Sequence, residues 1–120
     1  MTSNRPKPYR EERPWGNFVE FTNGDPSTVK IVTVKANEAL SLQSHSKREE
    51  FWHVISGSGF ATVGEARNAA KEGDEFFIPK GTKHRLEGGS NGISVLEISF
   101  GEFDETDIVR YEDRYGRTGA

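Results

Sequence analysis

The sequence predicts an all-β domain whose strands form an antiparallel barrel or jelly roll. Three observations favour this class. Roughly eight to ten short stretches are rich in β-branched and aromatic residues, Gly and Pro separate them, and no segment keeps a helical apolar period. The chain has 120 residues, which is enough for one hydrophobic core and too few for two.

The chain divides into an N-terminal arm and one folded domain. Residues 1–14 hold three of the five prolines and many charges, which predicts an extended arm. Folding is expected to begin near Trp15, which we assign to the core. Residues 15–120 are then expected to form a single domain.

The first strands are expected on either side of a turn. Residues 15–21 place large apolar side chains along one strand, and residues 28–35 are β-branched at nearly every position. Asn23-Gly24 and Asp25-Pro26 supply turn chemistry between them and predict a hairpin. Ala36-Asn37 then bends the chain, because Asn tolerates the left-handed backbone conformation.

The remaining strands follow the same pattern. Residues 40–45 alternate apolar and polar side chains up to a charged corner, and residues 51–59 form a strand that ends at a Gly-Ser-Gly turn. Residues 60–81 supply two or three more strands, and residues 84–101 are expected to close a hairpin over Gly88 to Gly92. An apolar group at residues 108–111 could dock the tail on the barrel.

The composition argues against several classes of protein. Lys and Arg number 16 against 19 Asp and Glu, a formal charge of -3, and no face is strongly basic, so nucleic acid is not an expected partner. Without cysteine, the chain has no disulfide, thiolate metal site or thiol nucleophile. The N-terminus lacks an apolar signal region and no apolar run is long enough to span a membrane, which predicts a cytoplasmic protein.

Strand parity brings a set of polar side chains together in the barrel. Gln43 and His45 are two residues apart and share a face, and Glu50 lies on the strand after the corner. His84, from a third strand, could complete the group, whereas His53 points the other way. Two imidazoles, a carboxylate and an amide oxygen suit one divalent ion such as zinc, manganese, cobalt, nickel or iron.

These residues lie in motifs that resemble a known family. "LSLQSHSKREEFW", "GDEFFIP" and "IPKGTKHRL" resemble the cupin domain of phosphomannose isomerases, especially the type II form. That form is usually the C-terminal domain of bifunctional mannose-6-phosphate isomerase/mannose-1-phosphate guanylyltransferases. "RPWGNF" and "DIVRYEDRYGR" resemble the family's start and end. The resemblance runs from Arg13 to Arg117 and implies a cupin double-stranded β-helix, a jelly-roll barrel.

The resemblance assigns roles to particular residues. It implies that Gln43, His45, Glu50 and His84 hold the metal. Gln43 stands where generic metal cupins have a His, which is the isomerase-type pattern. The Arg of the "DIVR" segment, a catalytic or substrate-contacting residue in the family, corresponds to Arg110.

The implied activity is metal-dependent conversion of mannose 6-phosphate to fructose 6-phosphate. Moving a proton between C1 and C2 through an enediol needs a Lewis acid, a base and cations for the phosphate and the developing charge. Arg110 is one such cation. Arg48 and Arg85 are further candidates, although solvated surface charge is the favoured interpretation of both.

Lys30 is the candidate for the base. It shares a face with Val32 and Val34, so it faces the cavity if they do. The opposite parity, with Val29 and Ile31 inside, is equally apolar and stays open.

Two other classes of function are weighed against the isomerase. A metal-binding or small-ligand-binding cupin without catalysis would share the barrel and ligands but need no phosphate site near Arg110. An iron-dependent oxygenase is disfavoured, because such cupins commonly present three His and Gln43 takes one of those places.

No Gly-rich nucleotide loop is present, so guanylyltransferase activity is not expected from this chain. A sugar phosphate and, from the resemblance, a second copy in a homodimer are the expected partners.

Overall fold

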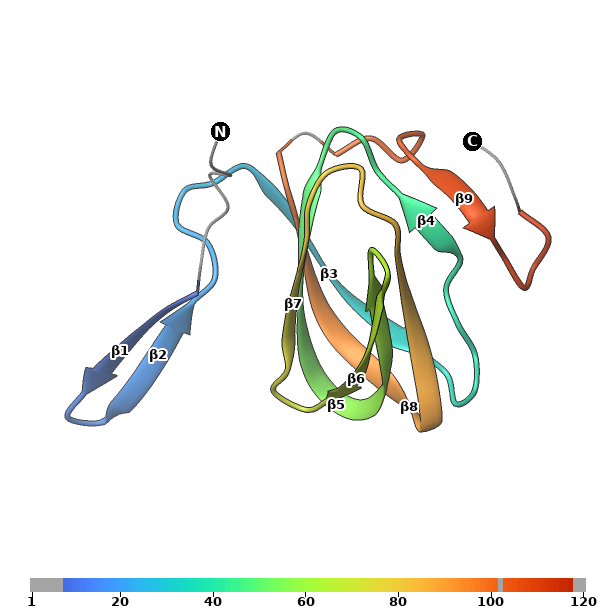
Figure 1. Ribbon diagram of the computed structural model, residues 1–120. Coiled ribbons are helices and arrows are strands. Elements are labelled where there is room, and N and C mark those ends of the chain that lie inside the picture. The colour runs from blue at the N-terminus through green and yellow to red at the C-terminus, as the bar shows by residue number, and fades with distance from the viewer. Residues whose placement is uncertain (1–7, 102, 118–120) are drawn as a thin grey trace.

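The computed structural model describes residues 8–101 and 103–117, and this part of the chain is all-β, as predicted (Figure 1). The strands are β1 (Tyr9–Arg13), β2 (Gly16–Glu20), β3 (Ser27–Val34), β4 (Leu42–Ser44), β5 (Glu49–Val63), β6 (Ala66–Lys71), β7 (Glu75–Ile78), β8 (His84–Phe100) and β9 (Val109–Glu112). Among the described residues, no helix is long and apolar enough to cross a membrane.

The barrel consists of two layers that share their two longest strands. The first half of β5 and the second half of β8 pair with each other, with β7 on one side and β3 on the other. The second half of β5 and the first half of β8 form the other layer with β6, β4 and β9. Buried side chains from both layers pack between them. They are Val34, Trp52, Val54, Ala61, Ala70, Ile78, Leu86, Ile93 and Val95.

Glycines let β5 and β8 pass from one layer to the other. The pairing register of β5 shifts between Val54 and Ser56 and again between Gly57 and Gly59. A Cβ on Gly59 would collide with the carbonyl oxygen of Glu87, so the two strands approach more closely than any other residue allows. The predicted turn at residues 57–59 is therefore wrong, because these residues lie inside the continuous strand β5. The predicted hairpin over residues 88–92 is also wrong, because these residues lie inside the continuous strand β8.

The N-terminal region also differs from the prediction. β1 lies within the predicted arm and pairs with β2 in a hairpin that stands apart from the barrel in Figure 1, while residues 1–7 lie outside the described part. The expected hairpin between residues 15–21 and 28–35 does not form, because β3 pairs with β8 instead. Trp15 is 73% exposed in the tight turn between β1 and β2, so its assignment to the core is wrong.

Two smaller predictions are confirmed. Asn37 has a φ of 60°, the left-handed conformation expected at the bend before β4. β9, from the tail, pairs with β4 and closes the edge of the second layer. The bend at Asn37 and the pairing with β9 together set the position of β4 in the second layer. β4 leads directly into the polar corner at residues 45–48.

Candidate metal centre

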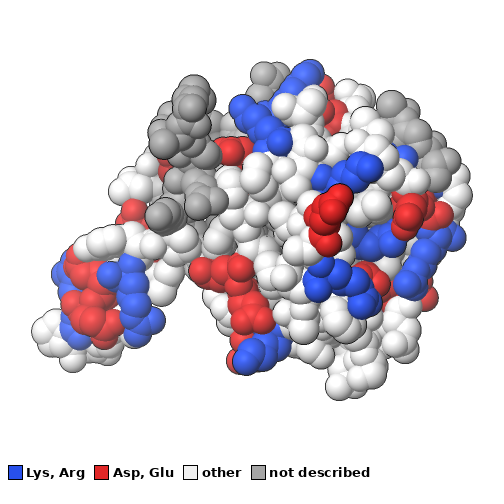
Figure 2. Space-filling model, viewed as in Figure 1, with Lys and Arg blue, Asp and Glu red and all other residues white. Residues whose placement is uncertain are grey.

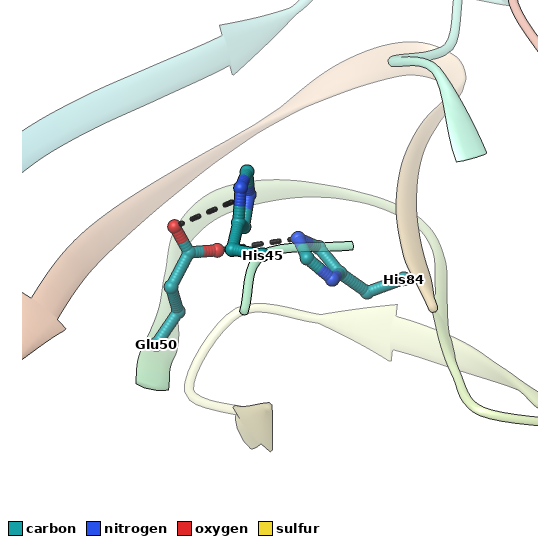
Figure 3. A group of neighbouring side chains, drawn as sticks. All are labelled: His45, Glu50 and His84. Atoms are coloured by element: carbon teal, nitrogen blue, oxygen red, sulfur yellow. Dashed lines mark ion pairs between the residues drawn. The ribbon is translucent and has the colours of Figure 1, made fainter. Parts of the chain in front are cut away.

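Three buried side chains from different segments meet where the two layers come together. His45 follows β4, Glu50 lies at the start of β5 and His84 begins β8. One ligand atom from each lies within 4.8 Å of the others. Glu50 points one carboxylate oxygen toward each imidazole, with Oε2 3.8 Å from His45 Nε2 and Oε1 3.3 Å from His84 Nε2 (Figure 3). The cluster expected from strand parity is present for these three residues.

Backbone carbonyls orient both imidazoles. His45 Nδ1 lies 2.7 Å from the carbonyl oxygen of Asp107, and His84 Nδ1 lies 2.9 Å from that of Thr82. Because a carbonyl can only accept, each Nδ1 carries the proton, and in a neutral ring Nε2 is left with a lone pair. Both lone pairs are directed into the cluster. This is the arrangement that metal-binding histidines commonly have.

The electrostatics of the cluster favour a cation. Burial raises the pKa of Glu50, but His84, His45 and Arg48 outweigh it and lower that pKa to about 2, so the carboxylate is charged at neutral pH. Burial lowers the pKa of His45 and favours its neutral form. Glu50 Oε1 and His84 Nε2 are buried without a hydrogen-bond partner. A carboxylate and two imidazole lone pairs facing one another fit a divalent ion.

Gln43 and Arg110 lie beside this cluster on neighbouring strands. Gln43 pairs with His84 on one side and with Arg110 on the other, and paired residues project to the same face of a sheet. The Oε1 atom of Gln43 accepts a hydrogen bond of 2.7 Å from the Ser41 hydroxyl. Nε of Arg110 is buried and has no hydrogen-bond partner. The structure thus brings Gln43 and Arg110 onto the face that carries His84.

Arg48 is part of the cluster, which corrects the sequence interpretation. Its side chain is 9% exposed, and Nε donates a 3.0 Å hydrogen bond to Glu50 Oε2. Its Nη2 group lies 3.2 Å from His45 Nε2. The favoured interpretation of Arg48 as solvated surface charge is wrong, because the charged corner folds inward over the cluster. Arg85, in contrast, binds the Leu40 carbonyl and Glu112 outside the cluster.

Lys30 lies at the edge of the same interior face. Val34 is buried while Val29 and Ile31 are 55% and 67% exposed, so the parity that turns Lys30 inward is the one that forms. The side chain of Lys30 is nevertheless exposed, and its ammonium lies 4.4 Å from the centre of the Phe103 ring. Whether Lys30 acts as a base stays a prediction.

Sequence reasoning missed Glu97, a second buried carboxylate of the barrel. Glu97 is 9% exposed, pairs with Trp52 and Lys30 on the neighbouring strands, and accepts a 3.1 Å hydrogen bond from the Trp52 indole. Burial, and then the charge of Glu50, raise its pKa. A lone carboxylate in the apolar run "ISVLEISF" was the signal that could have identified it.

Asp107 was also missed, although it holds the corner that carries His45. Its carboxylate accepts hydrogen bonds from the backbone N–H groups of Ser46 and Lys47 and from the Ser46 hydroxyl, at 2.7–2.9 Å. Burial raises the pKa of Asp107, but these hydrogen bonds and the nearby His45 lower it to about 2. Its backbone carbonyl fixes the His45 ring, so one residue orders both the loop and the ligand.

Two further features lie outside the cluster. His53 faces away, as predicted, and its Nδ1 lies 2.8 Å from Glu75 Oε2. A surface cavity of about 450 Å³ lies between the end of β3 and the C-terminal tail. Its lining includes none of the three cluster residues His45, Glu50 and His84.

Curated relatives of this chain are longer proteins that are named as mannose-1-phosphate guanylyltransferases or as xanthan or alginate biosynthesis proteins. The mannose-1-phosphate guanylyltransferase ManC of Salmonella typhimurium is 38% identical over 107 residues, which cover 88% of this chain and 22% of ManC. The xanthan biosynthesis protein XanB of Xanthomonas campestris pv. campestris is 42% identical over 108 residues, 88% of this chain and 23% of XanB. The chain spans less than a quarter of the length of either relative.

These relatives correct the functional expectation. The expected conversion of mannose 6-phosphate to fructose 6-phosphate is wrong for this chain, because its relatives are named for guanylyl transfer and for polysaccharide biosynthesis. The physical reason is that the motifs specify the barrel and its polar cluster, and many chemistries can use the same scaffold and ligands. The name of ManC is that of an enzyme, which is consistent with this chain being part of an enzyme. The names of these relatives do not support isomerase activity.

Solved structures confirm the cupin fold. Oxalate decarboxylase of Bacillus subtilis superimposes with a TM-score of 0.66 at 22% identity, over 72% of this chain and 24% of that chain. The capsular polysaccharide assembling protein CapF of Staphylococcus aureus gives a TM-score of 0.66 at 19% identity, over 88% of this chain and 34% of that chain. At these identities the likeness establishes the jelly-roll barrel alone.

The family match covers nearly the whole chain. Residues 4–113 match the family described as "Mannose-6-phosphate isomerase C-terminal", a range that includes both layers of the barrel and every residue of the polar cluster. With relatives more than 35% identical over the same region, this chain belongs to the mannose-6-phosphate isomerase C-terminal family of cupin domains.

Proposed function

We propose that this chain is a divalent-metal-binding cupin domain that binds a phosphorylated sugar as part of the enzymes of mannose-1-phosphate metabolism. The observation that carries the proposal is the buried group of His45, Glu50 and His84, whose ligand atoms lie within 4.8 Å of one another. Gln43, opposite His84, is the proposed fourth ligand. The nitrogen and oxygen donor set suits zinc, manganese, cobalt, nickel or iron.

The metal would supply a Lewis acid for sugar hydroxyl oxygens, and the protein would supply the recognition of the phosphate. Arg110 lies on the face of His84 and carries a buried Nε without a hydrogen-bond partner. A buried guanidinium donor is stabilised by an anion that accepts its hydrogen bonds. Arg110 is therefore the proposed phosphate contact, and Lys30 at the rim adds a second positive charge.

Metal titration tests the first half of the proposal. We expect calorimetry to give one equivalent of bound zinc or manganese for the wild type, and Glu50→Gln to weaken binding by about 100-fold because the charged ligand is lost. His53→Asn is the matched control, since His53 lies outside the cluster. Failure of the wild type to bind any of the five metals would refute the proposal, as would equal loss in the control.

Ligand titration tests the second half. Mannose 1-phosphate should bind the metal-loaded protein, and mannose should bind at least about tenfold more weakly because the charge-assisted contact is missing. Arg110→Met should abolish that preference, whereas Arg85→Met, on β8 and outside the cluster, should retain it. Equal affinity of the wild type for mannose and mannose 1-phosphate would contradict the role of Arg110.

We also propose that two copies associate through β3. Within residues 8–101 and 103–117, β3 pairs with β8 alone, and its outer face exposes Val29 and Ile31. The hairpin of β1 and β2 precedes β3 in the chain and projects away from the barrel in Figure 1. It carries both positive and negative side chains in Figure 2. A second copy would cover the exposed apolar surface and the open strand edge.

A further inference from the structure

Arg48 makes hydrogen bonds to the same atoms that would bind a metal. Its Nη2 group is 3.2 Å from His45 Nε2, and its Nε is 3.0 Å from Glu50 Oε2. These contacts bring a guanidinium, which is always charged, against two of the four proposed ligands, His45 and Glu50. No other cation is hydrogen-bonded to His45 or Glu50 among the described residues, the neighbouring imidazoles aside.

The contact with His45 cannot coexist with metal binding through the same nitrogen. Since His45 Nδ1 donates its proton to the Asp107 carbonyl, Nε2 has a single lone pair. That lone pair either accepts the hydrogen bond from Arg48 or binds a metal. Glu50 differs, because a carboxylate has several acceptor positions and can keep Arg48 on one of them.

We propose that Arg48 competes with the metal for His45, so that metal entry displaces its Nη2 group and Arg48 limits the metal affinity of the site. This inference rests on the proposed metal function. Two effects act in the same direction: the metal must replace a charge-assisted hydrogen bond, and it must bind close to a fixed positive charge.

The surroundings of Arg48 keep the displaced group near the cluster. Nη1 donates a 3.2 Å hydrogen bond to the carbonyl of Asp104, and the guanidinium carbon lies 4.6 Å from the centre of the Phe103 ring. Neither contact uses a ligand atom of the cluster. Arg48 can therefore release His45 by a small rotation while Asp104 and Phe103 still hold it, which makes the competition reversible.

The test compares zinc affinity in three proteins by competition with a chromophoric chelator. Arg48→Met removes every donor and keeps most of the side-chain volume, and we expect it to bind zinc at least about tenfold more tightly than the wild type. Lys47→Met is the control. It makes the same charge change at the adjacent position, where the ammonium lies 3.4 Å from Asp104 outside the cluster, and its affinity should stay near that of the wild type.

The outcomes separate this inference from the metal proposal. If the wild type binds zinc and Arg48→Met binds it equally well or more weakly, the proposed competition is overturned. The metal site would then still stand. If none of the three proteins binds zinc, the same comparison is made with manganese, cobalt, nickel and iron, and absence of binding of all five would overturn the metal site itself. If Arg48→Met does not fold, Arg48→Gln, which keeps a polar side chain without the charge, gives the same comparison with the same expected direction.

Discussion

Asp107 holds the His45 corner, so its replacement by alanine should destabilise the barrel. The carboxylate accepts three hydrogen bonds, two of them from the backbone N–H groups of Ser46 and Lys47. At about 1 kcal/mol for each bond, Asp107→Ala should lower the free energy of unfolding by about 3 kcal/mol. For a domain of this size, the melting temperature should fall by roughly 12–20 °C.

Urea unfolding followed by tryptophan fluorescence measures this loss, because Trp52 lies in the core next to His84. Asp107→Asn keeps one acceptor oxygen and should lose about half as much stability. Asp113→Ala is the control, since the side chain of Asp113 accepts hydrogen bonds from Arg117 and from the backbone of Tyr115, both in the same tail. A loss below about 1 kcal/mol in Asp107→Ala would refute the argument that this carboxylate holds the corner.

Three further outcomes are expected. The pKa of Glu50 is lowered to about 2 from an ordinary 4.5, so the stability that this carboxylate contributes is complete above pH 4.5 and is lost as the pH falls toward 2. Urea unfolding at about pH 5 and about pH 3 should show this loss, and Glu50→Gln should reduce it. Gly59→Ala should prevent folding, because the new Cβ meets the Glu87 carbonyl, whereas Gly24→Ala, in open space at a positive φ, should cost only about 1 kcal/mol by circular dichroism melts. Ile31→Glu should convert the proposed dimer to a monomer in light scattering, and an unchanged mass would count against association through β3.

The cluster could be predicted because strand parity and residue chemistry are both local. Gln43 and His45 follow the alternation of one strand, and Glu50 and His84 begin two others, so a barrel brings them together without any knowledge of the loops. Arg48 could not be placed this way. It lies in the corner at residues 45–48, whose path depends on Asp107, nearly sixty residues further along the chain.

The strand connections could be predicted only in part. Gly57 and Gly59 look like a turn, because glycine is common in turns, but in this fold they serve the close approach of two continuous strands. The partner of β3 is β8, and no local signal distinguishes that pairing from the hairpin with residues 15–21. The activity could not be predicted from the motifs at all, since they describe the scaffold and the ligands rather than the bond that is made or broken.

The pairing of β3 with β8 also has a consequence for how the chain folds. Ser27 pairs with Phe100, and Glu49 pairs with the same residue from the other side, so β3 waits for its partner β8 until almost the whole barrel sequence has been synthesised. Such distant pairings require large loops to close before any contact rewards them, which places folding in the millisecond-to-second range. Glu50 pairs with Ser99, and His84 pairs with Gln43 and Val63, so the two side chains meet only when strands distant in the sequence have paired. On the proposed metal function, we therefore expect metal binding to follow this step rather than to nucleate it.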